Sequence, residues 1–445
     1  MKLLEKARAL SFWTIDALRG GKIRRYLNNI KEIEDGLITE QELDAYYKKH
    51  LRRLLNHSVH SVPKYANLSE LLNEDNPIEK WPIVDKASLK ASGENCLSNL
   101  FNKKSLIPMS TSGSTGTPFT CWQNSDKKRH VNAEVLFYNG KIGFSIGRKI
   151  IYFRSIVNEV KKSQVQQYLQ NINLLDCCNL SDEVIKARLE EIKKLSANGG
   201  AMILSYASTL DAISRYFLKY GVQEASACNI YGIVSGSEML KDTTREILSN
   251  AFRCKVVSRY ANEENGFIGQ DDIDNNIFLH NRAHYYIEIL KIDQDILVEK
   301  GETGRIVITD LFNYSMPIIR YDTGDIGSWT EVCHNGIKRK AIGNFGGRRI
   351  DMIFDCNGNL VSPHSITNRM WEFGEIQQYQ FIQTQKSEYV LKLNTSHPVD
   401  EKRLIKILKE AVGNDSIVHI EYVKEIPVLA SGKRKYIVNL TNNQI

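Results

Sequence analysis

Residues 108–119 read PMSTSGSTGTPF, and this stretch organises the interpretation of the whole chain. Hydroxyl side chains surround Gly113 and Gly116, at Ser110, Thr111, Ser112, Ser114, Thr115 and Thr117. Glycines let backbone N–H groups come close to an anion, and hydroxyls add further donors, so this composition favours a polyphosphate-binding loop. A flexible surface linker is the alternative. Phosphate binding is preferred because the stretch is short and lies between the apolar Ile107 and the large Phe119.

Length and composition restrict the class of protein. The 445 residues suffice for two or three domains, and the 42% hydrophobic and 25% charged residues are typical of a globular protein. The net charge of +7 is mildly basic without a basic stripe, so we expect no nucleic-acid partner. No apolar run reaches transmembrane length. The eight cysteines form no CxxC pair and predict reduced thiols in a cytoplasmic protein. A homodimer is compatible with the sequence.

The first 30 residues predict an amphipathic helix rather than a signal peptide, because charges from Glu5 to Asp16 interrupt any apolar core. The larger apolar side chains fall near one side, at Leu3, Leu4, Leu10, Phe12, Ile15 and Leu18. Cations follow at Arg19, Lys22, Arg24 and Arg25. A helix packed on the main domain is the favoured interpretation. A helix that lies on a membrane surface is the alternative.

Residues 181–258 predict alternating helices and strands. Ser181 is expected to cap a helix that runs to Ser196 and ends before Gly199-Gly200. The elements expected next are a strand at 201–204, a helix at 209–220, a strand at 229–234, a helix at 240–252 and a strand at 255–258. Such alternation favours mostly parallel sheets covered by helices, so the predicted fold class is α/β.

From Tyr285 onward, short strands between glycine turns predict a β-rich subdomain, with strands at 286–290, 296–298 and 305–309. A small, mobile α+β domain is expected to follow, with strands near 352–354 and 389–393, a helix at 401–412 between Asp400 and Gly413, and a strand near 436–440. We therefore expect a large domain at 1–348, with a helical segment at 1–60, and a small C-terminal lid domain at 349–445.

Three further islands carry chemistry. Residues 260–266, YANEENG, follow a predicted strand, where ligands of open α/β sheets bind, and a carboxylate there suits Mg²⁺. Residues 320–325, RYDTGD, end in an aspartate suited to ribose hydroxyls. Residues 430–435, ASGKRK, offer a lysine to a phosphate or carboxylate. Taken singly, these islands also fit an acidic turn, a β-turn and a solvated basic turn.

In this order, the loop, the three islands and the segment Trp81–Lys86 resemble the adenylate-forming superfamily of acyl-CoA synthetases, aryl-CoA ligases and peptide-synthetase adenylation domains. The chain is most similar to the phenylacetate–CoA ligase branch and its CapK-like proteins of polysaccharide gene clusters. The resemblance implies an AMP-forming ligase that uses ATP, Mg²⁺ and a carboxylic acid, with CoA as the expected acyl acceptor. The alternatives are an amine, a hydroxyl or a carrier protein as acceptor, or a degenerate nucleotide-binding protein.

The resemblance implies which residues bind the nucleotide. Thr111–Thr117 resemble the loop around the β- and γ-phosphates of ATP. The segment beside the adenine corresponds to Ser235, Gly236, Ser237 and Glu238. Tyr260 resembles the aromatic residue that stacks on the adenine.

The resemblance also implies roles for four charged residues. Glu264 resembles the Mg²⁺-binding glutamate, and Asp325 resembles the aspartate that binds the ribose. Arg348, in a Gly-Arg pair, resembles the hinge arginine near the ribose. Lys433 resembles the catalytic lysine that contacts the carboxylate and the α-phosphate during adenylation.

Some positions depart from the family pattern. Ala261 stands where glycine is usual, Glu263 is a rival metal ligand, and Ile350-Asp351 replaces an acidic pair at the hinge. The pocket for the acid is weakly specified, and its candidate residues are Tyr138, Ser205, Tyr206, Ala207 and Ser235. Positions in the core or at helix caps are the alternative for each of them.

Overall fold

In this computed structural model the described residues are 2–111, 119–154, 163–177, 180–237, 239–272, 277–334, 336–348, 353–358, 360–361, 366, 369–370, 372–427 and 435–441. Their largest sheet has 11 strands in the order β10-β11-β12-β13-β9-β8-β7-β6-β5-β3-β4. Among these residues, none of the helices is both long enough and apolar enough to cross a membrane.

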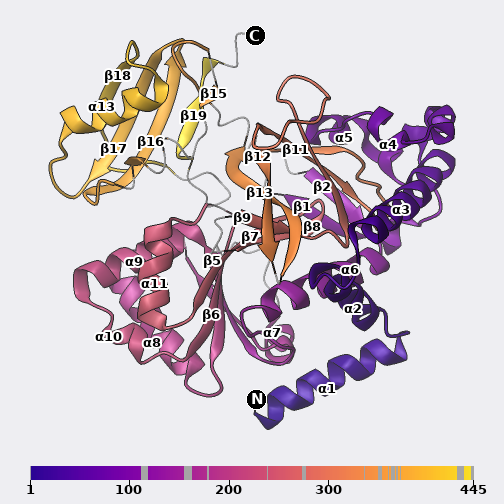
Figure 1. The fold of residues 1–445 in the computed structure, drawn as a ribbon. Coiled ribbons are helices and arrows are strands. Elements are labelled where there is room, and N and C mark those ends of the chain that lie inside the picture. Colours follow the sequence, from indigo (N-terminus) through magenta and orange to yellow (C-terminus); the bar gives the residue numbers. More distant parts are fainter. Residues whose placement is uncertain are drawn as a thin grey trace.

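One half of this sheet is parallel and is covered by helices. Its strands are β3 (Lys149–Arg154), β4 (Ile172–Asp176), β5 (Ala201–Tyr206), β6 (Ile230–Gly236) and β7 (Lys255–Asn262). The covering helices are α8 (Asp182–Ser196), α9 (Ala207–Tyr220), α10 (Gln223–Ser226) and α11 (Asp242–Phe252) (Figure 1). A short helix, α7 (Gln164–Gln170), connects β3 to β4. The hydroxyl of Ser181 accepts a hydrogen bond from the N–H of Val184, as predicted for the helix cap.

The other half of the sheet is antiparallel. Its strands are β8 (Gly266–Asp272), β9 (Ile277–His280), β10 (Tyr285–Leu290), β11 (Thr303–Asp310), β12 (Tyr321–His334) and β13 (Ile337–Arg348). Strand β7 joins the halves, because it pairs in parallel with β6 through Val257 and Ser258 and antiparallel with β8 from Arg259 onward. The α/β fold class and the β-rich region are therefore confirmed.

Helices precede this sheet, as predicted for the first 60 residues. They are α1 (Leu3–Leu18), α2 (Lys22–Glu34), α3 (Glu40–Ser61), η1 (Pro63–Asn73), α4 (Pro77–Lys80), α5 (Lys86–Ser92), η2 (Gly93–Cys96) and η3 (Lys103–Ser105). A two-stranded hairpin of β1 (Ile107–Thr111) and β2 (Phe119–Gln123) comes next, followed by α6 (Ser125–Gly140).

Helix α1 packs on the main body as expected, but not through its leucines. The side of α1 that faces the body carries the buried Glu5 and Asp16 and the half-buried Phe12 and Trp13. The leucines and Ile15 are exposed. The carboxylate of Asp16 explains this orientation, because it accepts hydrogen bonds from the first backbone N–H groups of α2, at Ile23 and Arg24.

The C-terminal part forms a separate sheet with its own core. Its elements are β14 (Ile353–Phe354), β15 (Leu360–Val361), β16 (Ile376–Gln385), β17 (Glu388–Thr395), α13 (Glu401–Val412), β18 (Ile417–Tyr422) and β19 (Ile437–Asn439). The sheet order is β18-β17-β16-β19 (Figure 1). Asp400 accepts a hydrogen bond from the N–H of Arg403, and Gly413, with φ of 99°, follows the last turn of α13, as predicted.

One predicted strand is wrong. Residues 296–298 form no extended ladder: Leu297 makes a single antiparallel bridge to Leu290 of β10. Two backbone hydrogen bonds flank this bridge, from the N–H of Lys291 to Ile296 at 2.8 Å and from the N–H of Val298 to Ile289 at 3.0 Å. The pairing stops there, and Ile296 and Leu297 are more than half exposed. The sequence reading also left out β4 and most of the long β12–β13 hairpin.

Candidate active site

The predicted phosphate loop connects the two strands of the β1–β2 hairpin. Thr111 and Phe119 pair across the ladder, so the backbone at both ends of residues 112–118 is held together. One step further in, the hydroxyls of Ser110 and Thr120 are 2.8 Å apart. Residues 112–118 themselves, and the side chain of Thr111, lie outside the described part of the chain.

Glu264 lies in the tight turn between β7 and β8. The Asn265 N–H donates to the side-chain oxygen of Asn262 at 2.8 Å, which closes the turn. This turn buries Glu264 and leaves its neighbour Glu263 exposed. Oε1 of Glu264 accepts a hydrogen bond from the hydroxyl of Tyr321 at 3.2 Å. Of the two rival carboxylates, Glu264 is therefore the one held in place.

The hairpin packs directly against this turn. The thiol of Cys121, in β2, donates to the carbonyl oxygen of Glu263 at 3.3 Å. Phe119 and Cys121 share a buried apolar cluster with Tyr321. Two islands that are far apart in the sequence, the phosphate loop and the Glu264 turn, are thus neighbours in space.

Lys86 is a site residue that the sequence reading left without a role. Its ammonium nitrogen lies 3.7 Å from Oε1 of Glu264 and 5.7 Å from the ring centroid of Phe119. Val84, two residues before Lys86, pairs with Tyr321, and its carbonyl accepts from the N–H of Asp322 at 2.8 Å. The segment Trp81–Lys86 therefore runs alongside the RYDTGD island.

Arg320 fixes this arrangement. Its guanidinium makes two hydrogen bonds to Glu288, at 3.0 and 2.9 Å, and donates to the carbonyl oxygens of Glu79 and Trp81 at 2.9 Å. Both charged groups are buried. Such a bidentate pair is geometrically specific, so it fixes the start of β12 relative to the Trp81 segment.

Tyr260 and Asp325 are in direct contact. The Tyr260 hydroxyl donates to Oδ2 of Asp325 at 2.8 Å, and its ring packs at 4.6 Å from that of Phe345. Burial and the nearby Asp325 raise the pKa of Tyr260 well above its ordinary value, so the phenol stays protonated and donates. Asp325 also faces Arg348 across the β12–β13 ladder. The predicted adenine, ribose and hinge residues are therefore brought together, although the side chain of Arg348 is not described.

The carboxyl ends of the parallel strands supply the next group. Ser205, Ser235 and Ser258 are aligned across β5, β6 and β7. The Ser235 hydroxyl is buried and has no hydrogen-bond partner among the described residues. Ser237 has φ of 70°, the left-handed region that L-residues rarely adopt. Glu238 lies outside the described residues.

A buried polar network supports the Glu264 turn from below. Glu134, on α6, accepts hydrogen bonds from the N–H of Phe267 at 2.9 Å and from Nδ1 of His284 at 2.7 Å. The Tyr285 hydroxyl lies 2.8 Å from both Glu134 Oε1 and the carbonyl oxygen of Asn265. Gly266, with φ of +124°, is required here because a Cβ would approach Glu134 Oε2 to 2.7 Å.

The network is also a charged one. Lys127, entirely buried, lies 2.7 Å from Asp310 and 4.0 Å from Glu134. Burial alone would raise the pKa of Glu134, but Lys127 and the hydrogen bond from His284 lower it below its ordinary value. Glu134 is therefore an anion that accepts from backbone and side chain alike. The spacing of Lys127, His130 and Glu134 at i, i+3 and i+7 was the available signal for this face of α6.

The candidate residues for the acid pocket are not all in one place. Tyr138 is fully buried, and its ring stacks on Phe267 at 4.5 Å within the cluster beneath α2. Tyr206 is the N-cap residue of α9, and Ala207 packs in the core under that helix. Tyr138 thus lies in a different apolar cluster from Ala207.

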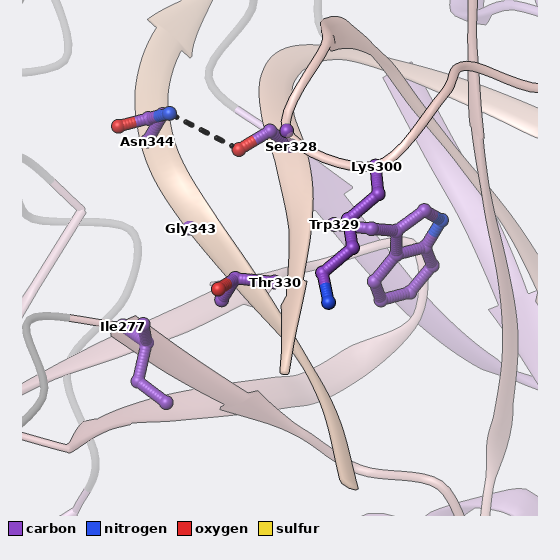
Figure 2. Close-up of a pocket in the computed structure, with 8 residues that line it drawn as sticks. Ile277, Lys300, Ser328, Trp329, Thr330, Gly343 and Asn344 are labelled. Atoms are coloured by element: carbon purple, nitrogen blue, oxygen red, sulfur yellow. Dashed lines mark hydrogen bonds between the residues drawn. The ribbon is translucent and has the colours of Figure 1, made fainter. Parts of the chain in front are cut away.

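A cavity of ≈ 490 Å³ opens on the β12–β13 hairpin, beyond Asp325. Figure 2 shows Lys300 beside the indole of Trp329, and Asn344 donating to the hydroxyl of Ser328 at 3.2 Å. The residues around this cavity include none of those that the sequence assigned to the nucleotide or the acid.

The residues around Glu264 fit a magnesium ion. Among the described residues, Tyr321 donates to Oε1 of Glu264 and the Lys86 ammonium lies 3.7 Å from that same oxygen, so both of these contacts are made through Oε1. The described residues contain no group of three or more His, Cys, Asp or Glu side chains that could hold a metal. A single carboxylate suits Mg²⁺, which keeps several waters and completes its shell with substrate phosphates. Lys433, the predicted catalytic lysine, lies outside the described residues.

Comparison with known proteins gives two sequence matches. Residues 353–440 match the protein family described as the CapK C-terminal domain. The chain is 23% identical over 379 residues to Protein CapK of Staphylococcus aureus, which covers 81% of this chain and 80% of that protein.

Solved structures share the fold. 2-Hydroxyisobutyryl-CoA ligase in the postadenylation state, in complex with R3-HIB-AMP, matches with a TM-score of 0.72, 14% identity and 92% of both chains covered. The same ligase with 2-HIB-AMP and CoA in the thioesterification state gives 0.57 at 15% identity and the same coverage of 92%. The amide bond synthetase McbA from Marinactinospora thermotolerans gives 0.54 at 14% identity, over 74% of this chain and 68% of that one.

The resemblance is confirmed for CapK and for the fold: the chain is similar to Protein CapK over most of its length, residues 353–440 match the CapK C-terminal domain, and the fold is that of the adenylate-forming acyl-CoA ligases.

Proposed function

We propose that this chain is an ATP-dependent, AMP-forming carboxylate ligase. The observation that carries the proposal is the convergence of separate sequence islands on one site. Tyr260 is hydrogen-bonded to Asp325, and Asp325 pairs with Arg348 across the β12–β13 ladder. Glu264 lies beside the β1–β2 hairpin, whose strands are connected by the predicted phosphate loop. A fold alone does not define a reaction, so this convergence of residues is what favours adenylation.

In the proposed reaction a carboxylate oxygen of the acid attacks the α-phosphorus of ATP. An O–P bond forms, the bond to the β-phosphate breaks, and pyrophosphate leaves from an acyl adenylate. The protein mainly positions the reactants and offsets charge. Tyr260 and Asp325 hold the nucleoside, the 112–118 loop holds the pyrophosphate, and Lys433 stabilises charge at the α-phosphate. A magnesium ion at Glu264 would supply further neutralisation of phosphate charge.

The acyl group is then proposed to pass to the thiol of CoA, releasing AMP. CoA is favoured because 2-hydroxyisobutyryl-CoA ligase matches this chain with a TM-score of 0.72, against 0.54 for the amide bond synthetase. An amine acceptor is the second candidate, because an amide bond synthetase shares the fold. We further propose a role in polysaccharide biosynthesis, on the strength of the similarity to Protein CapK. The division at residues 348/349 is proposed as the domain boundary.

Exchange of labelled pyrophosphate into ATP, with Mg²⁺ and a panel of carboxylic acids, tests the adenylation step. Acid-dependent exchange is the expected result. ATP binding without exchange for any acid, under conditions where a known ligase is active, would instead support a nucleotide-binding protein without catalysis.

Lys433→Ala is expected to lower the exchange rate about 100- to 1,000-fold, the usual effect of removing one group that stabilises charge in a transition state. Lys435→Ala is the matched control, because it removes a cation two residues away in the same basic segment. Equal losses in both variants, or none in Lys433→Ala, would contradict the role given to Lys433.

The acceptor is tested separately. Mass spectrometry of the products identifies the acceptor: with ATP, the acid and CoA, the protein should form an acyl-CoA thioester and release AMP. If an amine gives an amide and CoA gives no thioester, the acceptor is an amine, and the adenylation step stands.

A further inference from the structure

An exposed apolar surface on α1 and α7 has no place in the proposed reaction. On α1 the exposed fractions are 86% for Leu3, 49% for Leu4, 70% for Leu10, 48% for Ile15 and 83% for Leu18. At helical spacing these five residues share one side of α1. Soluble proteins rarely leave so many large apolar side chains together in water, which marks an interaction surface.

Helix α7 extends this surface. Its exposed apolar residues are Val165, Tyr168 and Leu169, each more than 60% exposed. Arg8 of α1 joins the two helices, because it donates to the carbonyl oxygen of Tyr168 at 2.8 Å and lies 5.1 Å from the centroid of its ring. Figure 1 shows α1 at the edge of the molecule with α7 above it.

The packing of α1 keeps this side outward. Gly147 approaches the helix so closely that a Cβ there would overlap the carbonyl oxygen of Glu5. Asp16 caps α2, and Arg24 lies 4.8 Å from the centroid of the Trp13 ring. These contacts fix the polar and aromatic side of α1 on the body, so the aliphatic side cannot rotate inward.

The distribution of charge identifies what covers the surface. Glu5 and Asp16 are the two acidic residues of α1, and both are buried against the body. Helix α7 has no acidic residue. Lys2, Lys6 and Arg19 are exposed beside the leucines. The exposed surface of these two helices is therefore aliphatic with a cationic border, the pattern of a helix that lies in the interface of an anionic membrane.

We propose that α1 and α7 form a docking surface for an anionic phospholipid bilayer, with the leucines of α1 inserted among the lipids. A second copy of this chain fits less well, because a two-fold contact through the same surface would bring two cationic borders together. This proposal does not depend on the acid or on the acyl acceptor.

The test is sedimentation of the whole protein with vesicles. The protein should bind vesicles that contain phosphatidylglycerol and should bind pure phosphatidylcholine vesicles weakly, and added salt should reduce the binding because it screens the cationic border. Equal binding to both vesicle types, or none to either, overturns the proposal.

Two double variants separate the contribution of the inserted leucines from that of the cationic border. Leu3→Asp with Leu10→Asp should weaken vesicle binding at least about tenfold, because two inserted side chains are lost. Lys6→Glu with Arg19→Glu should weaken binding to the anionic vesicles by about the same factor. The matched control is Leu218→Asp on α9, which changes a leucine of similar exposure, 72%, on a different surface. All variants should keep the far-ultraviolet spectrum of the native protein, since every changed side chain is exposed.

Two outcomes would refute the lipid proposal. One is an equal loss of vesicle binding in Leu218→Asp, which would mean that any exposed leucine suffices. The other is a native dimer that the Leu3→Asp/Leu10→Asp variant converts to monomers in analytical ultracentrifugation without any vesicle binding, which would assign the surface to a second copy.

Discussion

The two parts of the chain are stabilised in different ways. The part before residue 349 buries many charged side chains, among them Glu34, Lys127, Glu134, Arg282, Glu288, Asp310, Arg320 and Arg339. In the described residues from 353 to 441, the buried polar side chains are Gln383 and Ser416, and no charged side chain is buried. The core of that small part is aliphatic and aromatic.

This difference matches what each part does in the proposed reaction. Buried ion pairs fix geometry more than they add stability, because their attraction must first offset the loss of hydration. In the large part they hold the turn that carries Glu264 and the start of strand β12. If the small part is the mobile lid that the sequence resemblance implies, it needs only to stay folded as one body while it moves, and an apolar core with charges outside meets that need.

Among the predictions that test this difference, removal of Glu134 from the large part should change the free energy of unfolding most. Glu134→Ala leaves Lys127 and the N–H of Phe267 buried without this acceptor, and should cost about 3–5 kcal/mol of the free energy of unfolding. Hydrogen exchange followed by mass spectrometry should show lost protection in β8 and β10. The ATP–pyrophosphate exchange that depends on the carboxylic acid substrate should also fall. Full exchange activity in this variant would mean that the network does not position the Glu264 turn.

A matched side-chain truncation in the small part should destabilise that part alone. Leu391, fully buried in β17, pairs with Phe381 and Ile420, and Leu391→Ala should cost about 2–5 kcal/mol through the cavity that it leaves. Protection should be lost across β16, β17 and β18 and retained in β7 and β8. Loss of protection in both parts together would show that they unfold as one unit.

The two parts should also respond differently to pH. Burial, together with neighbouring cations, lowers the pKa of His280 to about 3 and that of His130 well below its ordinary 6.5. These histidines are neutral in the folded protein and bind protons when it unfolds below pH 6.5, so stability is full above that pH and decreases as the pH falls. Each of these histidines lowers the free energy of unfolding by up to about 1.4 kcal/mol for each pH unit below 6.5.

Urea unfolding between pH 7 and pH 5 measures this slope, and both histidines lie in the large part. His280→Gln should reduce the slope by about one proton. An unchanged slope in the variant would mean that His280 is already charged in the folded protein.

The smallest effect is expected at an ion pair on the surface of the small part. Arg403 and Glu372 are 3.2 Å apart, and their side chains are 56% and 50% exposed. Arg403→Ala should change the free energy of unfolding by no more than about 1 kcal/mol, because water screens the pair. A loss as large as that of Glu134→Ala would remove the distinction between the two parts.

Local chemistry made much of the fold predictable. The helix from 401 to 412 was bounded correctly because Asp400 and Gly413 are a cap and a stop that act within one turn. The alternation of strands and helices from 181 to 258 was predictable for the same reason. The β12–β13 hairpin was missed because residues 322–325, DTGD, are good turn formers, although its two strands are adjacent in sequence and pair from His334 and Ile337 outward.

The candidate site was predictable only as a set of islands. The sequence named Tyr260 and Asp325 separately, and only the fold shows that they share a hydrogen bond. Lys86 was overlooked because its proximity to Glu264 depends on the bridge between Val84 and Tyr321. Contacts of this kind depend on long-range topology, which a single sequence does not reveal.

Strand β7, which joins the two halves of the sheet, has a consequence for sequence variation. Successive side chains of a strand point to opposite faces, so a one-residue insertion or deletion between Ser258 and Tyr260 would turn Tyr260 away from Asp325. It would also shift the Glu264 turn relative to β8. Related sequences should therefore keep the length of this segment constant, whereas the turn at 291–302, at the rim of the sheet, should vary in length.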